Sequence, residues 1–183
     1  ANKFGRISPT SAEHVKKYFP QIDYIIDGGK THVGTESTVI KLYDDSFELL
    51  RPGVITKEEI ETIVPLQSTN RKQINSAPGM MKSHYSPVKP IYILSESLIK
   101  TMGVKNAGLL SFTKKYDEGF KKVITLSKNM DLREYAINLF DAMHEMEEAD
   151  VDLIVAEPVP ENGIGIAIMD RLKKASYNSQ NHW

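Results

Sequence analysis

Three short segments of this chain combine side chains that can hold a small polar or phosphorylated molecule. Residues 34–39, GTESTV, place three hydroxyl groups and one carboxylate at the entrance of a predicted strand, where they can donate to and accept from a ligand. Arg51 ends another predicted strand before a Pro-Gly turn, a position from which a guanidinium can hold a phosphate with two hydrogen bonds. His84 and Tyr85 are adjacent in a segment with no helical or strand period and with prolines at both ends, which favours ligand contact.

Each of these segments also has a simpler interpretation, and the residues alone do not decide between the two. The hydroxyl-rich segment can be a hydrophilic loop edge, Arg51 can form a surface salt bridge, and the His84–Tyr85 pair can pack the linker onto a domain. A fourth segment, GGKT at 28–31, looks like the end of a phosphate-binding loop. Tyr24 stands where that motif needs a glycine, and a strand rather than a helix is predicted to follow, so a turn between strands is expected.

The remaining polar residues give weaker signals. The five histidines have no spacing typical of metal ligands, so no metal site is predicted, and His144 is expected at the solvent edge of a long amphipathic helix. The absence of cysteine excludes disulfides, thiolate catalysis and cysteine-based zinc sites. Residues 157–163, EPVPENG, follow a predicted strand and form either a ligand loop at the carboxyl end of a parallel sheet or a plain connection.

The periodicity of apolar residues predicts two parts of different architecture. Up to residue 65 we expect a helix capped at Thr10, a buried strand at 24–26, strands at 37–43 and 47–50 forming a hairpin, and a helix capped at Thr56. After a linker at 66–88, strands alternate with helices, which indicates a parallel α/β layer. The expected strands there are 91–94, 107–112, 123–126 and 151–157, and the expected helices are 96–102, 131–148 and 165–175.

The predicted fold class is therefore α/β. Residues 1–65 form part of a mixed sheet with helices, residues 66–88 a linker, and residues 89–183 a Rossmann-like parallel domain. The chain of 183 residues has 40% apolar and 26% charged residues, as in an ordinary soluble globular protein. Its net charge is −1, and neither part is basic enough to bind nucleic acid by charge alone. With no apolar run near about 18 residues and no signal peptide, we expect a cytoplasmic chain outside the membrane.

Several motifs, taken in order, resemble those of one family. They are Ala1-Asn2, GRISPT at 5–10, DGG at 27–29, GTESTV at 34–39, LRPG at 50–53, PGM at 78–80, HYSP at 84–87, AEP at 156–158 and AIMDRL at 167–172. The pattern is similar to that of threonylcarbamoyl-AMP synthase in its long two-domain form, a YrdC-like catalytic domain followed by a Rossmann-like domain. The resemblance covers nearly the whole chain, and the linker and the spacing from ESTV to RPG are its specific parts.

The resemblance implies a reaction and its participants. Threonine and bicarbonate would give N-carboxythreonine, whose carboxylate attacks the α-phosphate of ATP, bound with Mg²⁺, to yield threonylcarbamoyl-AMP and pyrophosphate. Downstream tRNA-modification proteins would then place the group on an adenosine of tRNA. The implied partners are therefore these proteins and tRNA itself, with double-stranded RNA binding as a family property. No covalent enzyme intermediate is needed, so catalysis would rest on positioning and charge stabilisation.

The resemblance also implies roles for particular residues. Asn2, Ser8, Arg51 and Tyr85 would contact ATP, and Ser37 would hold threonine. Tyr85 would belong to a lid from the linker, with His84 anchoring it. Closing such a lid would exclude water from a labile mixed anhydride.

The resemblance begins part-way through the family's catalytic domain. The basic Lys-x-Arg motif and the serine of the Ser-x-Asn motif are not in this sequence, and Phe4 stands where a serine is common. With Ala1 in place of an initiator Met, the chain is expected to be a fragment that lacks the N-terminal half of the catalytic domain and exposes core surface. One rival is a non-catalytic nucleotide- or tRNA-binding module or inactive remnant, and another is a carbamoyl-adenylate former acting on a different amine.

Overall fold

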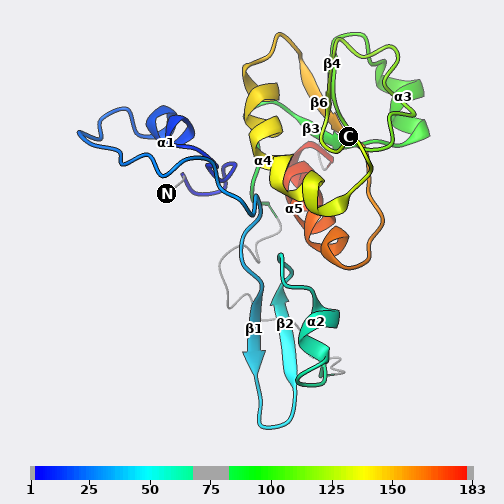
Figure 1. Cartoon of the computed structure of the whole chain (residues 1–183). Helices are drawn as coiled ribbons and strands as arrows, with labels where there is room; N and C mark the ends of the chain where they lie inside the picture. The colour runs from blue at the N-terminus through cyan, green and yellow to red at the C-terminus, as the bar shows by residue number, and fades with distance from the viewer. Residues whose placement is uncertain (1–2, 68–82, 181–183) are drawn as a thin grey trace.

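The computed structural model describes residues 3–67 and 83–180. The predicted ATP contact Asn2 and most of the predicted linker, residues 68–82, lie outside the described residues. Figure 1 shows a parallel sheet with helices packed around it and, projecting away from it, a separate two-stranded hairpin. This arrangement confirms the predicted α/β class, with antiparallel strands in the first part and parallel strands in the second.

The first part contains two short helices and the hairpin. Helix α1 (Ala12–Tyr18) is capped by Ser11, one residue later than predicted, because Thr10 instead contacts the ring of His14 through its amide and hydroxyl. Strands β1 (Val39–Leu42) and β2 (Phe47–Arg51) pair antiparallel. Helix α2 (Lys57–Glu61) has the predicted capping box between Thr56 and Glu59.

The predicted buried strand at 24–26 is wrong. The structure assigns no strand there, and Tyr24 and Ile26 are 89% and 97% exposed. A short apolar run forms a buried strand only where a neighbouring strand pairs with it and a packed layer covers it. No strand of the described residues pairs with residues 24–26. Several other large apolar side chains of the first part are also exposed, namely Phe4, Leu42, Ile55 and Ile63.

The second part is a four-stranded parallel sheet in the order β3-β6-β4-β5. Its elements are β3 (Ile91–Ile93), α3 (Glu96–Met102), β4 (Ala107–Ser111), β5 (Lys122–Thr125), α4 (Leu132–Glu148), β6 (Leu153–Ala156) and α5 (Ile164–Gln180). All seven lie within about two residues of their predicted positions except at the end of α5, which continues five residues further. The last strand lies between the first two, so the strand order cannot be read from the chain order.

The two faces of this sheet are covered by different elements. Helices α4 and α5 pack on one face and enclose the larger apolar core, which includes Leu139, Phe140, Met143, Ile168 and Leu172. Helix α3 and the segment 113–121 cover the other face with a smaller apolar cluster. In the described part of the chain, no helix has both the length and the apolarity needed to cross a bilayer.

Close backbone contact joins the two parts at Gly34. This glycine has a φ of +71°, and a Cβ there would lie 2.2 Å from the Cα of Ile137 in α4. Only glycine can combine this conformation with this approach. The loop that carries the hydroxyl-rich segment is thereby fixed against the long helix of the second part.

Candidate functional site

The hydroxyl-rich segment meets the last helix of the chain at Glu36. Its carboxylate accepts a hydrogen bond from Ser8 Oγ at 2.5 Å and another from Arg171 Nε at 2.8 Å. Arg171 comes from α5 and is fully buried. Its Nη1 also donates to the carbonyl of Pro52 and to Asp170. The guanidinium of Arg171 therefore holds together α5, the segment that contains Glu36 and the turn at Pro52.

The next residue along the chain, Ser37, is paired with Arg51. The Nε of Arg51 donates to the carbonyl of Ser37 at 3.1 Å, and its Nη2 donates to Ser37 Oγ at 3.2 Å. Because Ser37 Oγ accepts from the guanidinium, its own hydroxyl proton can be donated to a ligand. The structure thus brings together the two residues that the sequence singled out separately, next to the Glu36–Arg171 pair.

A cavity of about 480 Å³ adjoins Glu36 and Ser8. It is lined by Ser8, Pro9, Thr10, Thr31, His32, Val33, Gly34, Thr35, Glu36 and Phe140. The hydroxyl of Thr35 is buried and has no hydrogen-bond partner among the described residues. A buried hydroxyl without a partner is costly.

Tyr85 lies beneath this site and forms part of the apolar core. Its ring stacks on Phe140 with the centroids 5.6 Å apart, and the guanidinium carbon of Arg171 lies 5.3 Å from the ring centroid. Its backbone has a φ of +62°, which is uncommon for a residue other than glycine. Burial raises the pKa of its hydroxyl, which has no hydrogen-bond partner among the described residues.

His84 contacts Tyr85 edge-on, with the ring centroids 4.1 Å apart. Burial lowers the pKa of His84, and its backbone amide donates to the carbonyl of Lys174 in α5. The described end of the linker is therefore bound to α5, and the ring of Tyr85 is 1% exposed. The lid that the resemblance implies for these two residues stays a prediction.

His144 corrects another expectation. It is 2% exposed instead of lying at a solvent edge, because α1 covers this face of α4 and His14 stacks on it with the ring centroids 3.8 Å apart. Its Nε2 lies 3.2 Å from the carbonyl oxygen of Ser8 and can donate to it. His144 thus fixes the backbone of a residue that contacts Glu36.

From the stacked pair of His14 and His144 we predict that the chain loses stability in acid. Burial lowers the pKa of His144 to about 4, with the neighbouring His14 adding to the effect, and burial also lowers the pKa of His14. The unfolded chain takes up these protons near pH 6.5, whereas the folded chain resists them. The stabilisation is therefore complete above pH 6.5 and is lost as the pH falls toward 4, by about 3 kcal/mol for His144.

Thermal melts between pH 7.5 and 4.5 would measure this loss. We expect a His144→Gln variant to lose less of its melting temperature on acidification than the parent chain, and a control change of the exposed His32 to glutamine to leave the profile unaltered. Equal losses in the parent chain and the His144→Gln variant would contradict the assignment.

The sequence did not identify Glu36 and Arg171 as a pair, although both lie within quoted motifs. One signal was present for Arg171: at three residues after Ile168 and four before Ala175, it occupies the apolar stripe of its helix. A charged residue in such a stripe indicates a buried partner. Among the described residues, no group of three or more histidine and acidic side chains could hold a metal ion.

Comparisons with known families agree over the length of the chain. The family model described as threonylcarbamoyl-AMP synthase, C-terminal domain, matches residues 55–176, and one described as telomere recombination matches residues 1–53. The threonylcarbamoyl-AMP synthase of Bacillus subtilis is 39% identical over 195 residues, and that of Pyrococcus abyssi is 37% identical over 193 residues. Both alignments cover 96% of this chain, but only 55% and 56% of the respective relatives.

Solved structures give the same result. The crystal structure of P. abyssi Sua5 complexed with L-threonine superposes with a TM-score of 0.78 at 38% identity, covering 96% of this chain and 56% of that one. A P. abyssi Sua5 variant with alanine in place of a consecutive His-Tyr pair has a TM-score of 0.75 at 35% identity, covering 96% of this chain and 55% of that one. The chain spans about half the length of the relatives it matches, and it belongs to the threonylcarbamoyl-AMP synthase family.

Proposed function

We propose that this chain takes part in the synthesis of threonylcarbamoyl-AMP from L-threonine, bicarbonate and ATP, with release of pyrophosphate, for the modification of tRNA. The observation that carries the proposal is the pairing of Ser37 with Arg51, directly after Glu36, which lines a cavity together with Ser8 and Thr35. The threonine complex of the Pyrococcus relative supports it, because that protein has the same fold over nearly all of this chain.

In this proposal, Ser37 and Arg51 act on neighbouring parts of the substrates. The hydroxyl of Ser37, oriented by the guanidinium, donates to threonine. The positive charge of Arg51 stabilises the negative charge that develops on the α-phosphate of ATP as the carboxylate of N-carboxythreonine attacks it. The new bond joins this carboxylate oxygen to the α-phosphorus, and the bond from that phosphorus to the bridging oxygen breaks to release pyrophosphate.

Glu36 would position the site and not take part in proton transfer. Ser8 and Arg171 both donate to its carboxylate, and the Arg171 charge offsets its own. Pairing of this kind matters beside ATP, because an unpaired carboxylate would repel the phosphates. Ser8, Tyr85 and Asn2 remain the further proposed contacts to ATP.

Mg²⁺ enters this proposal with the nucleotide. The described residues hold no cluster of carboxylates and histidines that would bind the ion alone. Magnesium in nucleotide sites is commonly held by the phosphates together with one or two protein ligands and water. The ion would supply charge neutralisation on the leaving pyrophosphate. The proposed partners, the later tRNA-modification proteins and tRNA, act after the adenylate is released.

The test is threonine-dependent release of pyrophosphate from ATP in bicarbonate buffer, with the adenylate identified by mass spectrometry. A Ser37→Ala change is expected to raise the KM for threonine about tenfold, the effect of one lost hydrogen bond. A matched Ser46→Ala change in the exposed turn between β1 and β2 should have no effect. Nucleotide binding without threonine-dependent pyrophosphate release would favour a non-catalytic binding module, and equal rates with serine would favour a synthase of another amine.

A further inference from the structure

A second cavity lies entirely within the parallel domain. It has a volume of about 300 Å³ and is lined by Leu94, Ser95, Glu96, Ile99, Thr113, Lys115, Tyr116, Glu157 and Pro158. These residues follow the carboxyl ends of β3, β4 and β6, or lie in α3 and the segment after β4. The crevice outside the carboxyl ends of parallel strands is where ligands bind in open α/β sheets. None of these residues belongs to the site around Glu36.

One buried carboxylate is fixed at the base of this cavity. Glu157 is 2% exposed and directly follows β6. Its Oε2 accepts from the amides of Phe112 and Thr113 at 2.7 and 2.9 Å, and its Oε1 accepts from the hydroxyl of Thr113. Two carboxylate oxygens offer about four acceptor positions, so Oε1 retains one that three internal donors do not use.

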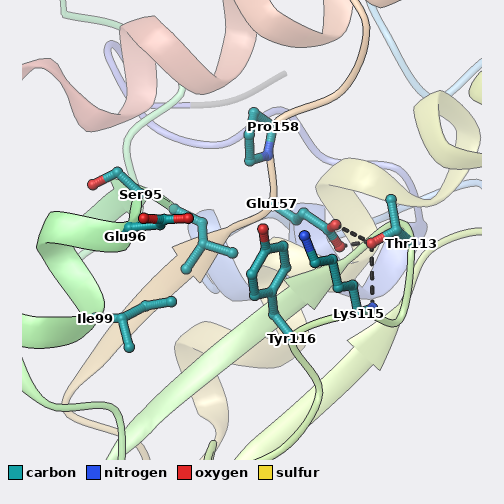
Figure 2. Close-up of a pocket in the computed structure, with 9 residues that line it drawn as sticks. Ser95, Glu96, Ile99, Thr113, Lys115, Tyr116, Glu157 and Pro158 are labelled. Atoms are coloured by element: carbon teal, nitrogen blue, oxygen red, sulfur yellow. Dashed lines mark hydrogen bonds between the residues drawn. The ribbon is translucent and has the colours of Figure 1, made fainter.

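The walls of the cavity also carry a second carboxylate, from Glu96, and an apolar surface. Figure 2 shows Ser95, Glu96 and Ile99 on one side of the cavity and Tyr116, Lys115 and Glu157 on the other, with Pro158 at its edge. Lys115 lies over the ring of Tyr116, with its Nζ 5.1 Å from the centroid. The apolar atoms come from Leu94, Ile99, Tyr116 and Pro158.

These walls specify the chemistry of an occupant. Two carboxylates require hydrogen-bond donors on the ligand, such as hydroxyl or amino groups, and they disfavour a ligand that is mainly anionic because only one lysine opposes them. The aromatic ring and the aliphatic side chains suit a flat apolar group. A volume of about 300 Å³ is at the small end of ligand sites. A base attached to a ribose diol has all of these properties.

We propose that this cavity binds a nucleoside, with its base against Tyr116 and Ile99 and its ribose hydroxyls donating to Glu157 and Glu96. The proposal does not depend on the adenylate synthesis proposed above, because the two sites share no residue. It gives the parallel domain a binding site of its own. Recognition is by base and ribose, so a phosphate is not needed.

The experiment is a calorimetric titration of the chain with adenosine. An Ile99→Trp change fills the cavity from its apolar wall and is expected to weaken binding at least tenfold. A Glu96→Gln change removes a charged acceptor from an exposed position and is expected to weaken it about tenfold. The control is Glu118→Gln, an exposed glutamate in the same segment as Tyr116 but outside the cavity, which should leave binding unchanged.

Two further titrations distinguish this site from the proposed ATP site and from a site that binds phosphate. Adenosine should bind an Arg51→Ala variant as it binds the parent chain, and 2′,3′-dideoxyadenosine should bind the parent chain about tenfold more weakly than adenosine. Binding that survives Ile99→Trp but is lost in Arg51→Ala would overturn the proposal. It would also be overturned by absence of adenosine binding, or by binding of AMP without binding of adenosine.

Discussion

Replacing Arg171 by leucine is expected to lower the free energy of unfolding by about 3 kcal/mol. The change removes the buried cation that pairs with Glu36 and donates to the carbonyl of Pro52, and it leaves a partly buried carboxylate without its counter-charge. The guanidinium contact with the ring of Tyr85 is lost as well. Denaturant unfolding of the parent chain and the variant measures the difference.

A double-mutant cycle separates this pair from a general packing effect. If the unpaired carboxylate causes the loss, then adding Glu36→Gln to Arg171→Leu should restore part of the stability. Lys173→Leu is the matched control on the same helix, because Lys173 is exposed and its ion pair is with the exposed Glu161. Additive losses from the two changes at Arg171 and Glu36 would show that the two residues are not coupled.

Replacing Arg51 by alanine is expected to lower kcat/KM for threonine-dependent pyrophosphate release by at least about 100-fold. One charged donor directed at developing negative charge contributes about 10²–10³ to the rate, and the same guanidinium orients Ser37. The assay is the one that tests the proposed function. Stability should change little, since the hydrogen bonds from Arg51 to Ser37 are near the surface.

Two further variants define how Arg51 acts. Arg51→Lys keeps the charge but cannot reproduce both hydrogen bonds to Ser37, so it should recover only part of the activity. Arg133→Ala removes an arginine that pairs with Glu59 at 3.4 Å on the surface and should have no effect. A loss of less than threefold in Arg51→Ala would show that this guanidinium does not contact the reacting phosphate.

The sequence predicted elements well where the signal is local. The helix at 96–102 and the one that follows Asp131 were predicted within one residue, because a capping side chain and a 3.6-residue period lie within the segment itself. The strand at 24–26 was wrong because three apolar residues cannot show whether another strand is present to cover them. His144 was placed at a solvent edge because the period of its own helix contains no information on the packing of α1.

The candidate site could likewise be predicted from local sequence signals only in part. Residue type and position singled out Arg51 and the segment 34–39, and the family resemblance singled out Ser37 within it, but the hydrogen bonds between these residues depend on the pairing of β1 with β2 and on the turn that follows. The pairing of Glu36 with Arg171 joins residues 135 positions apart, and nothing in either motif names the other. Contacts of this kind follow from tertiary packing, which a single sequence without an alignment does not specify.

The 135 positions that separate Glu36 from Arg171 have a consequence for the synthesis of the protein. A ribosome adds about 5–20 residues per second, so Glu36 is synthesised about 7–27 seconds before the arginine 135 residues later that pairs with it. During that interval the hydroxyl-rich segment cannot acquire its native geometry, whatever the earlier elements have already formed. The site around Glu36 is therefore completed only when α5 has been translated and has docked, and a nascent chain stalled before this helix should not retain the threonine and ATP proposed as ligands of that site.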